Sequence, residues 1–363
     1  MINSSEVDTK EVLQQNELTV LQTSIWINDH SGPELKFFII EAKKLPKRHA
    51  GVGLARKIGM DEAVVRFDRN FNENGIISCF DADCKCDPNY LIALESHFAS
   101  NPQAQGCSVY YEHPLIGNEF EASIYEGIVD YELFLRYYNQ GLRFAGFPFA
   151  FHTVGSAMAV TSKVYQKQGG MNKRKAGEDF YFLQKIIYLG NFTELNTTRI
   201  IPSPRTSNRV PFGTGKAILK WLEKKELITY DPQVFWDLKL FISELPQLFC
   251  DKSATTILSG LSPALKSFLI SRNFENKVRE IKANSSSQLL FEKRFFQWFN
   301  GFVVLKFVHF ARDNYYKPIK IGSASSELLT VLGFDTSGFS RQEILVKYRA
   351  IEKIADNSKK SDG

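Results

Sequence analysis

Residues 75–83 read Gly-Ile-Ile-Ser-Cys-Phe-Asp-Ala-Asp, and this stretch decides the expected fold. An apolar run bounded by glycine and by acidic residues predicts a buried β-strand that ends at Phe80. Asp81 and Asp83 would then stand at the carboxyl end of the strand, the edge where open α/β sheets bind ligands. Both carboxylates could reach one Mg²⁺ or Mn²⁺ ion, since these cations prefer oxygen ligands. Taken alone, such a triplet more often caps a helix or solvates a turn.

Helix and strand patterns alternate on both sides of this stretch, which predicts an α/β domain. Asp87 and Pro88 are expected to begin the next helix, and Gly141 is expected to close a long aromatic one. Glycine in the segment from His49 to Ala63 lets a backbone or a ligand approach closely. The expected elements are helices at 10–28, within 49–63, at 87–98 and 120–139, and strands at 37–41, 107–111 and within 149–160.

A second acidic pair, Glu178 and Asp179, opens an apolar-faced helix that is expected to end at Gly190. Acidic residues in a first helical turn also complement the helix dipole, which is worth about 0.3 to 1 kcal/mol each without any catalytic role. Gly155 and Ser156 precede this pair and could line an acceptor pocket with little steric bulk. A catalytic reading and a purely structural reading of the pair both remain open on these residues alone.

Basic residues that could balance phosphate charge fall in two places. Arg56 and Lys57 lie in the expected helix before the acidic triplet, although such side chains are usually solvated. Arg205 and Arg209 lie in the Pro-, Ser- and Gly-rich segment 202–215, which is typical of a mobile loop or a domain boundary. From such a loop they could bind a pyrophosphate bidentately.

Composition narrows the partners and the compartment. The net charge of +5 is modest and spread along the chain, so nucleic acid is not an expected partner. Five cysteines without a second close pair fit reduced thiols in a cytoplasm. The apolar stretch 298–310 is interrupted by Lys306, which favours a core or membrane-surface helix over a membrane span. We therefore expect a cytoplasmic protein, with peripheral contact to the inner face of the membrane through its C-terminal region.

Three regions are expected along the chain. Residues 1–215 carry the α/β pattern and all of the candidate site residues. Residues 216–355 alternate apolar and charged positions between glycine stops, which predicts a helical accessory region. Residues 356–363 lack apolar content and are expected to form a disordered tail.

The order of these motifs resembles that of the family 2 glycosyltransferases of GT-A fold. The resemblance lies in the glycine-containing segment 53–63, the triplet 81–83, Gly155-Ser156, Gly169-Gly170 and Glu178-Asp179. The second acidic pair follows the first by 178 − 81 = 97 positions, as in that family. The resemblance implies a Rossmann-like, mostly parallel mixed sheet with flanking helices. It covers about residues 1–215 and says nothing of the rest.

The resemblance also implies roles. Asp83 would be the main ligand of Mn²⁺ or Mg²⁺, Asp81 would contact the donor or the metal, and Asp179, beside Glu178, would be the general base. The implied reaction is inverting transfer of a sugar from a nucleotide-diphosphate sugar, the uridine type being favoured. The acceptor would be a hydroxyl on a glycan or lipid-linked glycan, in polysaccharide or glycoconjugate synthesis.

The sequence departs from the family pattern at its beginning. Residues 1–6 resemble the tail of the family's second strand, so the first strand and part of the second are expected to precede Met1. Asn3 and Ser4 are the candidates for the uridine-binding turn. Two alternatives follow: a catalytically inactive relative that binds sugar nucleotides or glycans, and a nucleotidyltransferase, although a glycine-rich N-terminal phosphate loop is not evident.

Overall fold

A computed structural model describes residues 1–208, 213–250 and 252–358, and the chain divides into two compact units. The first unit comprises Met1–Tyr111, Thr153–Pro202 and Asn208–Gly213. The second comprises Glu112–His152, Ser203–Ser207 and Thr214–Gly363. The chain therefore passes between the units more than once, whereas the sequence pattern suggested one boundary near residue 215.

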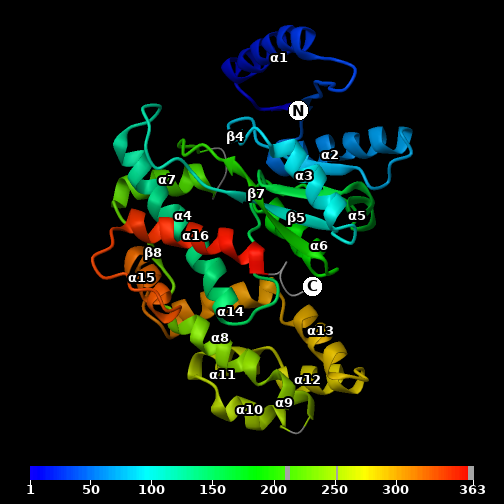
Figure 1. The fold of residues 1–363 in the computed structure, drawn as a ribbon. Coiled ribbons are helices and arrows are strands. Elements are labelled where there is room, and N and C mark those ends of the chain that lie inside the picture. The colour runs from blue at the N-terminus through cyan, green and yellow to red at the C-terminus, as the bar shows by residue number, and fades with distance from the viewer. Residues whose placement is uncertain (209–212, 251, 359–363) are drawn as a thin grey trace. The chain divides into compact units, whose positions relative to one another are not determined.

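A five-stranded mixed sheet forms the centre of the first unit (Figure 1). Its order is β3 (Ile76–Cys79), β6 (Met158–Thr161), β5 (Gly106–Tyr111), β7 (Phe192–Ile201) and β4 (Lys85–Cys86). Only β5 and β7 pair in parallel; β6 is antiparallel to both β3 and β5, and β4 is antiparallel to β7. The α/β class is confirmed, but the expectation of a mostly parallel sheet is wrong. The reason is that β6 runs the opposite way between β3 and β5.

Four helices of the first unit pack around this sheet. They are α2 (Val52–Arg69), α3 (Tyr90–Ser100), α5 (Ser162–Lys167) and α6 (Glu178–Ile187). Helix α2 packs against β3, α5 and α6, and α3 packs against β7. Every residue of β5 is buried, as expected of a strand covered on both faces. The strand predicted to carry the acidic triplet is confirmed as β3, and it ends two residues before Asp81.

The N-terminal residues form a separate two-stranded parallel sheet. Strand β1 (Ile2–Ser5) pairs with β2 (Glu41–Leu45), and α1 (Lys10–His30) connects them. The expected helix at 10–28 is confirmed, whereas the strand expected at 37–41 begins only at Glu41, where pairing with Ile2 sets the register. No side chain of α1 is buried, and its apolar residues Leu21, Ile25 and Trp26 are exposed.

Two helix boundaries differ from the sequence prediction for tertiary reasons. Helix α3 begins at Tyr90 and not at residue 87, because the Asp87 carboxylate accepts hydrogen bonds from Arg199. Helix α4 (Ala122–Phe144) continues past Gly141. A Cβ atom at Gly141 would lie 2.4 Å from the nearest ring atom of Phe235, so this glycine permits close packing and does not end the helix.

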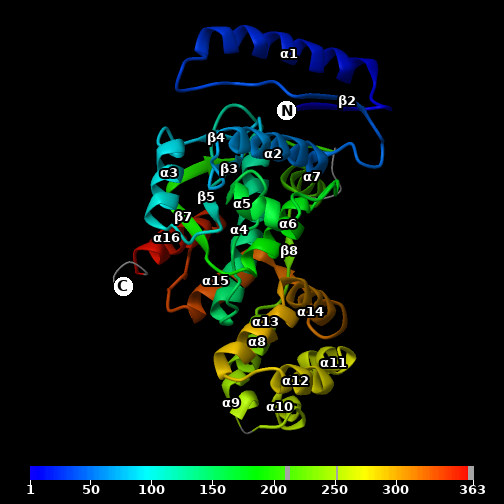
Figure 2. The same ribbon diagram turned by 90° about the vertical axis from the view of Figure 1, so that its right-hand side faces the viewer.

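The second unit is mainly helical, as expected for residues 216–355. Helix α4 packs against α7, α8, α15 and α16, and α9–α12 lie side by side in both views (Figures 1 and 2). The elements are α7 (Thr214–Lys224), β8 (Ile228–Thr229), α8 (Gln233–Ser243), α9 (Leu245–Cys250), α10 (Ala254–Gly260), α11 (Pro263–Ser271), α12 (Phe274–Ala283), α13 (Gln288–Trp298), α14 (Gly301–Asn314), β9 (Ile319–Lys320), α15 (Ile321–Val331) and α16 (Arg341–Ser358).

Two C-terminal expectations can be compared with these elements. Helix α16 extends to Ser358, so residues 356–358 are helical and not part of a disordered tail; residues 359–363 lie outside the described residues. The apolar stretch 298–310 is divided between α13 and α14. Within the ranges that the structure describes, none of the helices is both long enough and apolar enough to cross a bilayer.

Buried ion pairs join α4 to α16 within the second unit. The carboxylate of Glu132 accepts hydrogen bonds from Arg136 Nε at 2.8 Å, Arg349 Nε at 2.7 Å and the His113 backbone N–H at 2.8 Å. Arg136 also bonds Glu352 of α16. Burial raises the pKa of Glu352, but Arg136 and other basic groups lower it by more, to about 2. Removing one partner of such a network leaves an uncompensated buried charge.

The packing of Gly141 on Phe235 predicts that Gly141→Ala destabilises the second unit by about 1 to 3 kcal/mol, because an added methyl must displace a buried ring. Chemical denaturation followed by circular dichroism measures this change. Gly59→Ala in α2 is the matched control: it too is a helical glycine, but no atom lies within 4 Å of the added Cβ. The control should retain or gain stability, and equal losses in both variants would contradict the packing role of Gly141.

Candidate functional site

The guanidinium of Arg56 joins the two predicted acidic motifs. It extends from α2, and its Nη2 donates to Asp81 Oδ1 at 2.7 Å and to Oδ2 at 2.9 Å. Its Nη1 donates to Glu178 at the start of α6. The side chains of Arg56 and Glu178 are 11% and 3% exposed, whereas that of Asp81 is 41% exposed. The contact between Arg56 and Glu178 is therefore buried, whereas the contact between Arg56 and Asp81 is open to solvent at Asp81.

Asp179 lies beside this pair and is held by backbone donors. Its Oδ2 accepts from the Gly155 N–H at 2.9 Å, and its Oδ1 accepts from the Phe180 N–H at 2.7 Å. A Cβ atom at Gly155 would lie 2.2 Å from Arg56 Nη1, so the space that glycine leaves is filled by the guanidinium. We call Asp81, Glu178 and Asp179, gathered around Arg56, the acidic cluster.

Burial raises the pKa values of two carboxylates of the acidic cluster, Glu178 and Asp179. It raises the pKa of Glu178 to about 7; the neighbouring Asp179 charge adds to this shift and Arg56 opposes it. Burial also raises the pKa of Asp179, although Arg56 and the N–H groups of Phe180 and Gly155 lower it in part. A position at a helix N-terminus lowers the pKa of a carboxylate, but the net shift of Asp179 is upward because desolvation outweighs the stabilising charges and hydrogen bonds. Glu178 can thus exchange a proton near neutral pH.

The carboxylates at the end of β3 fit a divalent cation only in part. Asp83 is exposed, whereas both oxygens of Asp81 accept hydrogen bonds from Arg56. Among the described residues, no group of three or more His, Cys, Asp or Glu side chains could hold a metal ion. Mg²⁺ often takes only one or two protein carboxylates and completes its shell with water and substrate phosphates. Asp83, together with Asp81, whose oxygens retain further lone pairs, would supply such a site.

Other predicted residues of the first unit have separate partners. Lys57 Nζ pairs with Asp61 at 2.9 Å, so its charge is already balanced within α2. Ser156 is buried and forms a side-chain hydrogen bond with Cys84. Burial raises the pKa of the Cys84 thiol to about 11, and all five cysteines are free.

Asn3 and Ser4 hold the N-terminal sheet together. The Asn3 carbonyl accepts from Asn16 at 3.2 Å, and Ser4 Oγ accepts from the Lys44 N–H at 3.4 Å. No described hydrogen bond joins them to the acidic cluster. Arg205 belongs to the second unit, and Arg209 lies outside the described residues.

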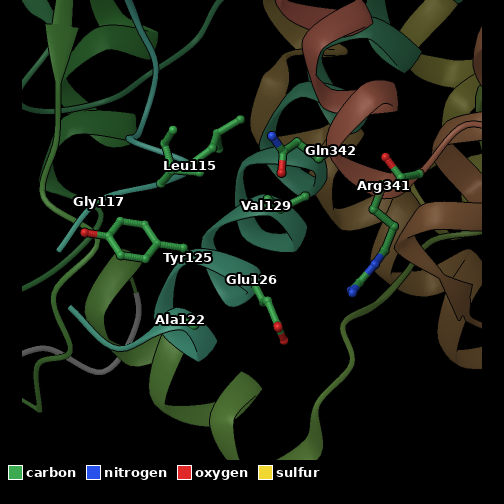
Figure 3. A pocket seen from close by; sticks show the side chains of 10 residues that line it. Leu115, Gly117, Ala122, Tyr125, Glu126, Val129, Arg341 and Gln342 are labelled. Carbon is green, nitrogen blue, oxygen red and sulfur yellow. The ribbon is translucent and has the colours of Figure 1, made fainter.

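The second unit contains a pocket of about 440 Å³ that no sequence motif indicated (Figure 3). Leu115, Tyr125 and Val129 line it with apolar groups, and Glu126 and Arg341 line it with opposite charges. Arg341 Nη1 donates at 2.6 Å to the buried Asp130, which also accepts from Trp221 Nε1. Glu126 and Arg341 lie on α4 and α16, so only the tertiary fold brings them together.

Removal of Arg56 should leave Glu178 as a buried carboxylate without its cation. Because Arg56 lowers the pKa of Glu178, its removal should raise that pKa further, so at about pH 8 the variant must either bury an unpaired carboxylate or take up a proton. We therefore expect Arg56→Met to cost about 3 to 5 kcal/mol of unfolding free energy. The double variant Arg56→Met/Glu178→Gln should recover part of this loss, since no buried charge remains at residue 178. Urea denaturation of the four proteins of the cycle measures the coupling, and strictly additive losses would contradict a direct pair.

The raised pKa of Glu178 predicts a dependence of stability on pH. Between about pH 4.5 and 7 the folded protein retains a proton that the unfolded chain releases, so the unfolding free energy should fall as pH rises through this window. The full effect is on the order of 3 kcal/mol for a shift from the ordinary value to about 7. The unfolding free energy of Glu178→Gln should fall less steeply with pH. That of Glu73→Gln, which changes an exposed carboxylate, should follow the wild type. If the unfolding free energies of Glu178→Gln and of the wild type changed in parallel with pH, the pH dependence would not come from Glu178.

Comparisons with known proteins add no relatives to this description. The chain matches no family model, no curated protein and no solved structure. The geometry of the acidic cluster is therefore the observation on which a functional conclusion rests.

Proposed function

We propose that the chain is an inverting, metal-dependent glycosyltransferase of GT-A type that moves a sugar from a nucleotide-diphosphate sugar to a hydroxyl of a glycan or lipid-linked glycan. The observation that carries the proposal is the acidic cluster: Arg56 bonds both Asp81 and Glu178, and Gly155 bonds Asp179. Motifs that resemble those of family 2 glycosyltransferases in their order thus also meet in space. The mixed α/β sheet is compatible with this proposal.

Asp179 is the proposed general base. Each of its oxygens accepts one backbone hydrogen bond, which fixes the carboxylate and leaves a further lone pair on each oxygen. Burial raises its pKa, which makes it a stronger base than an exposed aspartate. It would take the proton from the acceptor hydroxyl as the oxygen attacks the anomeric carbon, and the nucleoside diphosphate would leave from the opposite side of that carbon.

Arg56 is a proposed positioning residue. Because its guanidinium bonds Asp81 and Glu178 at once, it fixes the end of β3 relative to the start of α6. Asp83 and Asp81 are the residues that would hold Mn²⁺ or Mg²⁺, which when bound would stabilise negative charge on the departing diphosphate. Glu178, whose pKa is about 7, would hold or release a proton beside Asp179 near neutral pH.

One observation favours a second candidate, a catalytically inactive protein that binds sugar nucleotides. Arg56 Nη2 already bonds both oxygens of Asp81, so a cation at Asp81 must share these oxygens with a positively charged group. The hydrogen bonds between Arg56 and Asp81 are charge-assisted and therefore stronger than those between neutral groups. Donor hydrolysis separates the two candidates, since a binding protein would gain thermal stability from the ligand without turnover.

The test is a panel of nucleotide sugars, assayed with Mn²⁺ for thermal stabilisation and for release of nucleoside diphosphate. Asp83→Ala should weaken Mn²⁺-dependent donor binding by about tenfold or more, because it removes a charged ligand. Asp179→Asn should leave donor binding intact but slow transfer by about a hundredfold or more, as expected for loss of a general base.

Asp68→Asn is the matched control. It removes an exposed carboxylate of α2 and should leave both binding and turnover unchanged. Full transfer by Asp179→Asn would refute the base assignment. Stabilisation by a donor without release of nucleoside diphosphate in the wild type would favour the binding protein.

A further inference from the structure

A basic pocket lies in the first unit, and no sequence motif indicated it. It has a volume of about 650 Å³, and its lining residues are Glu6, Pro46, Lys47, Arg48 and Lys175. Three cationic side chains face one carboxylate, so the local charge is 3 − 1 = +2. The Glu6 carboxylate accepts a hydrogen bond from the Lys47 backbone N–H at 2.9 Å, which fixes the turn after β2.

The cations of this pocket lack carboxylate partners. Throughout residues 1–208, 213–250 and 252–358, no ion pair involves Lys47, Arg48 or Lys175. The two basic residues that the sequence suggested as phosphate contacts, Arg56 and Lys57, do have carboxylate partners. Arg56 pairs with Asp81 and Glu178, and Lys57 pairs with Asp61. Positive charge that is not paired with a carboxylate is therefore present in this pocket, whereas the charges of Arg56 and Lys57 are balanced.

Two glycines bring the pocket next to the acidic cluster. A Cβ atom at Gly51 would lie 3.3 Å from Lys175 Cγ, and one at Gly53 would lie 2.1 Å from the Arg174 carbonyl oxygen and 3.0 Å from Glu178 Cβ. The start of α2 and the residue before it therefore pack closely against the start of α6 and the residues before it. Lys175 is three positions before Glu178, so the pocket and the acidic cluster share the same two segments.

We infer that Lys47, Arg48 and Lys175 form a binding site for a phosphate or diphosphate group of a substrate. Unpaired Lys and Arg side chains form charge-assisted hydrogen bonds with phosphate oxygens, and Arg binds them bidentately. That the group belongs to a nucleotide donor or to a lipid-linked acceptor rests on the proposed function; phosphate binding itself does not.

The experiment is calorimetric titration of the full chain with inorganic pyrophosphate. Lys47→Gln/Lys175→Gln should weaken binding by about tenfold or more, since two charge-assisted contacts are lost. The control Lys36→Gln/Lys173→Gln removes the same charge from exposed positions outside the pocket that also form no ion pair among the described residues, and it should change the affinity by less than about twofold. Absence of pyrophosphate binding, or equal weakening in both double variants, would overturn the site.

Competition then identifies the source of the phosphate. Displacement of pyrophosphate by UDP assigns the pocket to the donor, and displacement by geranyl diphosphate but not by UDP assigns it to a lipid-linked acceptor. Because these titrations need no turnover, pyrophosphate binding can hold while sugar transfer fails, or the reverse. The two results therefore test the pocket and the proposed function separately.

Discussion

One guanidinium shared between two carboxylates organises the first unit. Arg56 is almost buried, and its charge is accommodated because Asp81 and Glu178 face it from a strand end and a helix start. The sharing constrains its neighbours: residue 155 must be glycine to leave room for the guanidinium, and Asp179 then receives the Gly155 N–H. Desolvation of the same group of carboxylates raises the pKa values of Glu178 and Asp179. Charge balance, steric space and basicity in this region therefore follow from one interaction.

Local sequence patterns predicted those parts of the fold that depend on neighbouring residues. The strand before Asp81, helix α6 at Glu178 and the helical character beyond residue 216 have clear apolar periodicity. Strand direction in the sheet could not be predicted in this way, because periodicity does not say whether β6 enters between β3 and β5. Gly141 shows the same limit: a glycine near a helix end suggests a stop, but its role is set by Phe235, which lies far away in the sequence.

In the candidate site, too, local sequence patterns predicted some of the residues and not others. The acidic residues could be identified from their order, because each follows a recognisable strand or opens a recognisable helix. The ion pairs of Arg56 with Asp81 and Glu178 could not be predicted, since these partners are 25 and 122 positions away and the contacts depend on side-chain geometry. The cations around Lys175 were missed for the opposite reason: they belong to no periodic element or motif, and only the close approach of two loops gathers them.

The assignment of α4 to the second unit has a consequence for biosynthesis. The residues of α4 are translated before those of β6 and β7, yet α4 packs against α15 and α16 at the other end of the chain. On the ribosome, α7 and α8 can cover part of α4 first, whereas the part of α4 that packs against α15 and α16 stays uncovered until those later helices emerge. Contacts of such long sequence separation slow folding and leave apolar surface exposed meanwhile. The nascent chain thus exposes part of a hydrophobic helix, to which chaperones can bind, until α15 and α16 have been synthesised.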